Sequence, residues 1–187
     1  MDARVAWLGF HAIEGISLRR LERLLAHYGS VLDAWNAPEA ELRALGLPEG
    51  PLARLVAARR AGLPYRILDA AERAGARVLV YPDEDYPALL REIPSPPLAL
   101  FVKGSLERAD ARAVALVGTR QASSYGLQVA RTFAAEFAQA GITVVSGLAR
   151  GIDRAAHEAA LEAGGRTIAV LGTGIDVVYP AGHRLLA

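Results

Sequence analysis

The stretch ITVVSGLARGID (residues 142–153) passes from a short apolar run through a glycine-bearing turn into a helical pattern. Two further stretches begin in the same way, AVALVGTR (residues 113–120) and TIAVLGTG (residues 167–174). Such apolar runs are typical of parallel strands that are buried on both faces. Because helical patterns lie between them, the sequence predicts a β-α-β-α-β unit with a Rossmann-like parallel sheet, which is an α/β fold.

The three turns are the main candidate for a site. In open parallel sheets, ligands bind outside the carboxyl ends of the strands, so we expect the turns to gather at one edge. Two of them carry an arginine, Arg120 and Arg150. Glycine lets an anion approach the backbone amides, and arginine adds a permanently charged, bidentate contact. The sequence therefore predicts a phosphate site at this edge, with Gly118 and Arg120 at its first turn.

Other polar residues near the edge have two interpretations each. Ser123 and Ser124 offer hydroxyls to a ligand, but we favour a helix cap for them. Asp153 and His157 lie four residues apart on one helical face. A metal site or a general base is possible for this pair, but we favour charge at a helix start and a structural hydrogen bond. Tyr179 either stacks on a nucleic-acid base or packs in the core.

Several classes of site are excluded or unsupported. The chain contains no cysteine, which excludes disulfides, zinc fingers and cysteine nucleophiles. The glycine spacing after Gly118 fits neither the Gly-x-Gly-x-x-Gly dinucleotide fingerprint nor a P-loop, so we expect no cofactor. Two candidate ligands do not make a metal site, and we expect none. The formal net charge of +1 means that any nucleic-acid contact has to come from a local patch.

The chain divides into three expected parts. Short amphipathic helices over 1–62 predict a small all-α bundle, and 63–104 is a connecting segment that leads into the Rossmann-like domain at 105–187. Strand patterns at 77–80 and 98–102 are expected to widen the parallel sheet. Sheets of this kind commonly have about five or six strands, so we expect the C-terminal part of this domain to be absent.

Two turns of the helical bundle, EGISL (residues 14–18) and LGLP (residues 45–48), resemble helix-hairpin-helix turns. The backbone amides of such turns can hold a DNA phosphate. The usual Gly-x-Gly hairpin is incomplete in both, and we favour a bundle that packs or docks a partner.

The sequence also predicts a compartment. The start of the chain lacks the pattern of a signal peptide, and no apolar stretch reaches the ~20 residues that span a bilayer. We therefore expect a cytoplasmic protein with no membrane contact.

Taken together, the motifs are similar to those of one known family. Three sets resemble the DNA processing protein A family (DprA/Smf) in order and spacing. They are VALVGTR with SYG (114–120 and 124–126), SGLARGID with AH (146–153 and 156–157), and TIAVLG through YP (167–180). The helical start resembles the family's sterile-alpha-motif-like (SAM-like) domain less specifically. The resemblance also implies that the chain stops within the family's Rossmann domain.

This resemblance implies a non-enzymatic protein of natural transformation. The family binds incoming single-stranded DNA, protects it and helps load the RecA recombinase on it, typically as a homodimer through its Rossmann domain. The predicted DNA-phosphate site comprises Gly118, Thr119, Arg120, Ser123, Gly126, Ser146, Gly147, Arg150 and Gly151. A structural or secondary role next to this site is predicted for Asp153, His157, Gly172, Gly174 and Tyr179.

Two other classes of function stay open. A nucleotide-binding enzyme on a related Rossmann fold, such as a nucleoside-monophosphate phosphoribohydrolase, could hold one 5′-phosphate at the same edge. The Pro-Gly-Gly-x-Gly-Thr motif of such enzymes is missing from this chain. The third class is a protein-interaction module that uses the helical bundle.

Overall fold

A computed structural model describes residues 2–187 of the chain. Internal contacts divide the chain into two compact units, one up to Gly104 and one from Ser105 onward. None of the helices in residues 2–187 has the length and the apolar character required to cross a bilayer.

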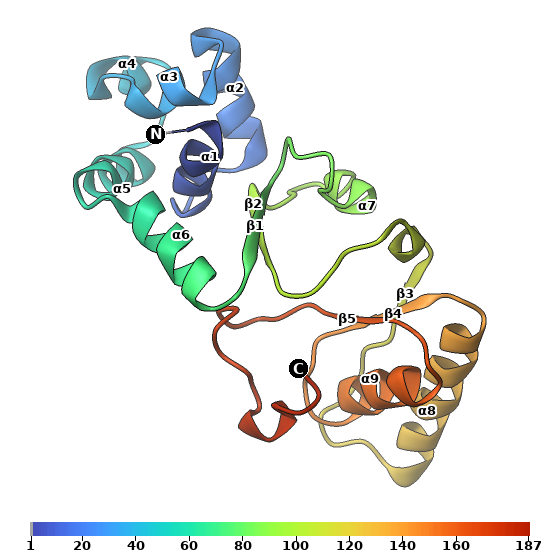
Figure 1. Cartoon of the computed structure of the whole chain (residues 1–187). Helices are drawn as coiled ribbons and strands as arrows, with labels where there is room; N and C mark the ends of the chain where they lie inside the picture. Colours follow the sequence, from blue (N-terminus) through green and yellow to red (C-terminus); the bar gives the residue numbers. More distant parts are fainter. Residues whose placement is uncertain (1) are drawn as a thin grey trace. The chain divides into compact units, whose positions relative to one another are not determined.

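The first unit is built mainly from short helices (Figure 1). Their bounds are α1 Ala3–His11, α2 Leu18–Tyr28, α3 Val31–Asn36, α4 Glu39–Ala44, α5 Glu49–Arg60 and α6 Leu63–Arg73. Asp2 and Ser30 cap α1 and α3, because each side chain accepts a hydrogen bond from a first-turn amide. Phe10 and Trp35 meet edge to face in the core, with ring centroids 5.1 Å apart. The helical region predicted at the start of the chain is confirmed.

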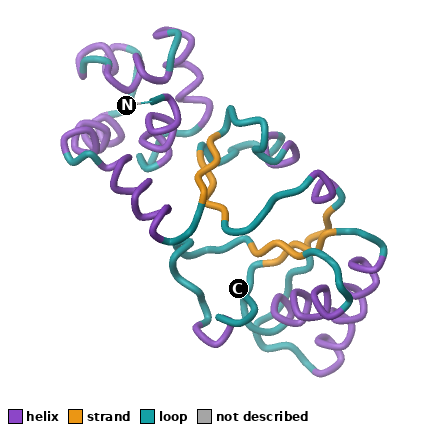
Figure 2. Tube along the Cα trace, viewed as in Figure 1, coloured by secondary structure: helices purple, strands orange, loops and turns teal. Residues whose placement is uncertain are grey.

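A two-stranded antiparallel ribbon completes this unit (Figure 2). Strand β1 Arg77–Val80 pairs with strand β2 Ala99–Val102, so the expectation that these strands widen the parallel sheet was wrong. The segment between them holds α7 Ala88–Arg91 and is closed where the Tyr86 hydroxyl donates to the Pro97 carbonyl, at 2.8 Å. The connector folds back on itself, since the Tyr81 amide also donates to the Leu98 carbonyl at 3.0 Å, and it therefore returns β2 beside β1 in the opposite direction.

The second unit contains the predicted Rossmann-like sheet. Its elements are η1 Arg108–Ala111, β3 Ala113–Ala115, α8 Ser124–Gln139, β4 Thr143–Ser146, α9 Ile152–Glu162, β5 Thr167–Ala169 and η2 Ala181–His183. The strands are parallel and lie in the order β3-β4-β5. Two crossovers of the same hand place α8 and α9 on one side of this sheet (Figure 1). Alanines of both helices pack there against Val144 of the central strand.

A charged network anchors the amino-terminal side of the sheet. Arg166, just before β5, donates to both carboxylate oxygens of Asp110, at 3.0 and 2.9 Å. The Thr143 hydroxyl donates to the same carboxylate at 2.8 Å, so η1, β4 and β5 are joined. The hydrogen bond from Arg166 is the largest of the effects that lower the pKa of Asp110 to about 2, against the effect of burial. This network helps to fix how β4 and β5 are aligned, and the turns at the carboxyl ends of the strands depend on that alignment.

Candidate nucleic-acid interface

The parallel register brings the predicted turns to one edge of the sheet. Leu116 and Val170 continue the ladder past the ends of β3 and β5, since Leu116 N–H donates to the Val145 carbonyl at 2.9 Å and Val170 N–H to the Ser146 carbonyl at 2.8 Å. The turns that follow β3 and β4 touch directly, because the Ile152 amide donates to the Thr119 carbonyl at 3.2 Å. The first two glycine turns therefore form one continuous surface.

The first turn runs from Gly118 to the start of α8. Gly118 is required by packing, because a Cβ there would lie 2.6 Å from Ile152 Cγ1. Thr119 Oγ1 accepts from the Gln121 amide at 3.1 Å. The Ser123 hydroxyl caps α8 by accepting from the Gly126 amide, also at 3.1 Å, which is the interpretation that we favoured for it.

The second turn connects β4 to α9 and is held from inside. The Ser146 hydroxyl is buried and donates to the Leu116 carbonyl at 2.6 Å, so it ties β4 to β3. Asp153, also buried, accepts from the Gly147 amide at 3.1 Å. Gly151 has φ +77° and ψ −125°, and a Cβ there would lie 2.2 Å from the Thr119 carbonyl oxygen. Only glycine fits at this junction of the two turns.

Two histidines hold the middle of the second turn. The Leu148 amide donates to Nε2 of His157 at 3.3 Å, and Nδ1 of His183 lies 2.9 Å from the Leu148 carbonyl oxygen. The other ring nitrogen of His157, Nδ1, lies 2.6 Å from Thr167 Oγ1. Burial lowers the pKa of His157, while Asp153 raises it and His183 lowers it further. His157 thus has the structural hydrogen bonds that we favoured.

His183 is a residue that sequence reasoning missed. It lies 35 residues from Leu148 in the chain and belongs to the short helix η2. No motif or periodicity surrounds it, so only the tertiary contact could have identified it.

The edge retains groups that are free to hold an anion. Within residues 2–187, the amides of 118–120 and 149–151 donate to no protein acceptor. Within the same residues, the exposed side chains of Arg120 and Arg150 form neither an ion pair nor a hydrogen bond with the protein. Two unpaired guanidinium groups beside free amides are the usual composition of a phosphate site. The arrangement can therefore bind a phosphate, and no catalytic group has to be assumed.

The third turn lies after β5 at the same edge of the sheet but is largely closed on itself. Thr173 Oγ1 donates to the Val177 carbonyl, and the Val177 amide donates to Gly174, both at 2.9 Å. Across the described chain, no hydrogen bond joins 172–179 to the other two turns. Tyr179 is 52% exposed, so it is not in the core, and its stacking on a base stays a prediction.

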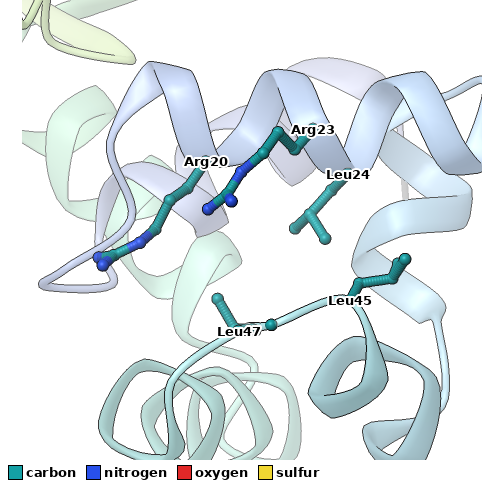
Figure 3. A pocket seen from close by; sticks show the side chains of 6 residues that line it. Arg20, Arg23, Leu24, Leu45 and Leu47 are labelled. Atoms are coloured by element: carbon teal, nitrogen blue, oxygen red, sulfur yellow. The ribbon is translucent and has the colours of Figure 1, made fainter.

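A second candidate lies in the helical unit, where α2 faces the α4–α5 turn (Figure 3). Its pocket is lined by Arg20, Arg23, Leu24, Leu45, Gly46 and Leu47. The amides of this turn are already used, because Gly46 N–H donates to Arg43 and Leu47 N–H to Leu42, both at 3.0 Å. The backbone amides of this turn therefore cannot act as those of a helix-hairpin-helix motif do. Only the two arginine side chains give this pocket a positive charge.

Comparison with known proteins assigns the chain to a family. The family model described as DNA recombination-mediator protein A matches residues 77–187. The chain is 36% identical over 185 residues to Protein Smf of Synechocystis sp., covering 96% of this chain and 46% of that protein. It is 45% identical over 104 residues to DNA processing protein DprA of Streptococcus pneumoniae, covering 56% of this chain and 36% of that one. The chain thus spans about half the length of such relatives or less.

Solved structures agree with this assignment. The X-ray structure of DprA from Streptococcus pneumoniae matches with a TM-score of 0.71 and 29% identity, over 100% of this chain and 63% of that one. A DNA processing protein A from Helicobacter pylori, described by its single-stranded DNA binding mode, matches with a TM-score of 0.52 and 30% identity, over 60% and 51% of the two chains. These similarities confirm the resemblance of the motifs, and the chain belongs to the DNA recombination-mediator protein A (DprA/Smf) family.

Proposed function

We propose that the edge formed by the turns 118–126 and 146–151 binds the phosphate backbone of single-stranded DNA. The observation that carries this proposal is the pair of unpaired arginines, Arg120 and Arg150, beside amides that have no acceptor within residues 2–187. The relative from Helicobacter pylori, described by its single-stranded DNA binding mode, supports the choice of ligand.

We further propose that the protein acts by binding and is not an enzyme. Asp153 and His157 are the carboxylate and the imidazole that hydrogen-bond to the second turn, and both are buried. Both ring nitrogens of His157 are occupied, so this residue presents no free base to a ligand at the edge. In the full-length protein, this DNA binding would serve natural transformation in the cytoplasm. A homodimer would protect incoming single strands and help load RecA on them.

Fluorescence anisotropy of a labelled oligo-dT tests the first proposal, at low and high salt and beside a duplex control. Replacing Arg120→Ala should weaken binding about tenfold or more for all sequences alike, because a phosphate contact carries no base information. The slope of log affinity against log salt should also become shallower by about 0.7. The matched control is Arg60→Ala, an exposed arginine in the helical unit. Equal affinities of the Arg120→Ala variant and the parent would remove Arg120 from the site.

A further inference from the structure

The residue Leu148, in the middle of the second turn, has an unusual backbone conformation. Within residues 2–187 it is the single non-glycine residue with a positive φ, 57°. This left-handed conformation is unfavourable for a residue with a side chain, so the surrounding structure has to hold it. Leu148 is also 2% exposed, so its backbone polar groups have no ready access to water.

Both backbone polar groups of Leu148 are satisfied by histidine side chains. The amide donates to His157 Nε2 at 3.3 Å, and the carbonyl oxygen lies 2.9 Å from His183 Nδ1, which donates to it. The two rings come from α9 and η2 and are 1% and 4% exposed. We call this pair, His157 and His183, the histidine clasp.

The hydrogen bonds of the clasp specify the protonation state of His157. Nε2 accepts from Leu148, so it carries no proton, and Nδ1 carries the proton and donates to Thr167 Oγ1 at 2.6 Å. Thr167 Oγ1 in turn donates to the Val144 carbonyl at 2.7 Å. Every hydrogen in this chain of bonds has one acceptor. Only the neutral imidazole with its proton on Nδ1 satisfies all of them.

From this geometry, and resting on the proposed function, we propose that the histidine clasp positions the turn that carries Arg150 and that protonation of His157 releases this turn. A protonated His157 would have no lone pair for the Leu148 amide. The amide would then be buried without an acceptor, which is unfavourable. The strain of the left-handed Leu148 would no longer be balanced, and the free amides of 149–151 would leave their place at the edge.

The charged and titratable groups around His157 determine when this happens. Burial of the ring is the largest effect and favours the neutral form, and His183, which faces it from η2, acts in the same direction. Asp153, one turn earlier on α9, opposes them. Since the net effect lowers the pKa of His157, the turn is intact at neutral pH and is released in acid. DNA affinity should accordingly be lost as the pH falls below the ordinary range of histidine.

The free protein tests the clasp without DNA. Nitrogen-15 NMR of the imidazole side chains should show His157 neutral with its proton on Nδ1 at about pH 7.5. The amide resonance of Leu148 should move as His157 titrates. A proton on Nε2, or a Leu148 amide that does not respond to the titration, would overturn the proposal.

Binding of labelled oligo-dT from about pH 7.5 to about 4.5 tests the consequence, because a lowered pKa places the titration of His157 below its ordinary value. The parent should lose about tenfold or more in affinity over this range, and His157→Leu should be weakened to the same extent already at the upper pH. His157→Gln is the conservative variant, because a side-chain oxygen can accept from Leu148 but does not titrate. It should bind near the parent's level at the upper pH and lose much less in acid. His27→Gln, at an exposed position of α2, is the control and should follow the parent.

The outcomes separate the two proposals. If the parent protein binds no oligo-dT at the upper pH, the proposed function is contradicted. The NMR titration alone then tests the histidine clasp. A parent that binds equally at both pH values, or a folded His157→Leu variant with the parent's affinity, overturns the clasp and leaves the DNA site standing. If His157→Leu fails to fold, the pH profile of His157→Gln decides, and a profile identical to the parent's counts against the clasp.

Discussion

Two regions of this chain combine a glycine turn with nearby arginines, and they differ in what their backbone amides do. In the α4–α5 turn of the helical unit, Gly46 and Leu47 donate back to the end of α4. At the edge of the parallel sheet, the amides of 118–120 and 149–151 have no protein acceptor within residues 2–187. In a turn that closes its own helix, the backbone amides already donate to carbonyls of that helix. In a turn between a strand and the next helix, the amides can remain without a protein acceptor and are available to a ligand. The state of the amides therefore separates a structural glycine turn from a candidate anion site.

The largest expected difference between the regions comes from replacing their turn glycines by alanine. Gly151→Ala should destabilise the second unit by about 3 kcal/mol or more, because a Cβ would lie 2.2 Å from the Thr119 carbonyl oxygen in a strained backbone conformation. Gly46→Ala should cost only about 1 kcal/mol, since its φ of +81° is unfavourable but nothing lies within 4 Å of the added atom. Urea unfolding of both variants measures the contrast. Similar losses would show that the turns 118–120 and 146–151 are not packed together as described.

The arginines of the two regions should differ in DNA binding. Replacing Arg120 and Arg150 together by alanine should lower oligo-dT affinity about a hundredfold, because two phosphate contacts are lost. Replacing Arg20 and Arg23, which line the pocket of the helical unit, should leave the affinity nearly unchanged. Anisotropy titrations of both double variants at one salt concentration test this. A larger loss in the Arg20 and Arg23 variant would move the DNA site to the helical unit.

The ion pairs of the two units should differ in their response to acid. Asp110→Asn should destabilise the second unit by about 2 kcal/mol at neutral pH, because Arg166 loses a charged acceptor. The pKa of Asp110 is lowered from 3.8 to about 2, so its contribution to stability is complete above pH 4 and is lost as the pH falls towards 2. The variant should therefore show a flatter stability curve between about pH 4 and 2. Denaturant unfolding across this range measures it.

The control for this prediction is Glu49→Gln, which breaks the exposed pair of Arg43 and Glu49 in the helical unit. Exposed pairs contribute little because water and salt screen them. No measurable change is expected, and a loss comparable to that of Asp110→Asn would contradict the distinction between the two pairs.

The smallest expected effect comes from the serine caps. Ser30→Ala and Ser123→Ala should each cost about 1 kcal/mol, because each hydroxyl accepts from a first-turn amide at 3.1 Å. Thermal unfolding of the two variants measures the caps. Oligo-dT binding then distinguishes the two roles of Ser123, since a loss of affinity in Ser123→Ala but not in Ser30→Ala would show that its hydroxyl also contacts phosphate.

Much of the second unit could be predicted from the sequence because its signals are local. The apolar runs before Gly118, Gly147 and Gly172 contain the three parallel strands of one sheet, as predicted. Ser123 caps α8, also as predicted. The antiparallel pairing of β1 and β2 could not be predicted from their patterns. A short apolar strand does not specify its partner, and the partner here was decided by the chain reversal between 81 and 98.

The sequence by itself determined the strands, the helices, the positions of the glycine turns and the two arginines, because periodicity, caps and turn residues act over a few neighbours. Only the tertiary structure decided which of these groups remain free. The Ser146 hydroxyl donates to the carbonyl of Leu116, which is 30 residues away in the chain. The carbonyl of Leu148 accepts from His183, which is 35 residues away. Such hydrogen bonds depend on how strands and loops meet in space. For this reason, the polar residues at the edge define a candidate site only once it is known which of their donors and acceptors already bond to the protein.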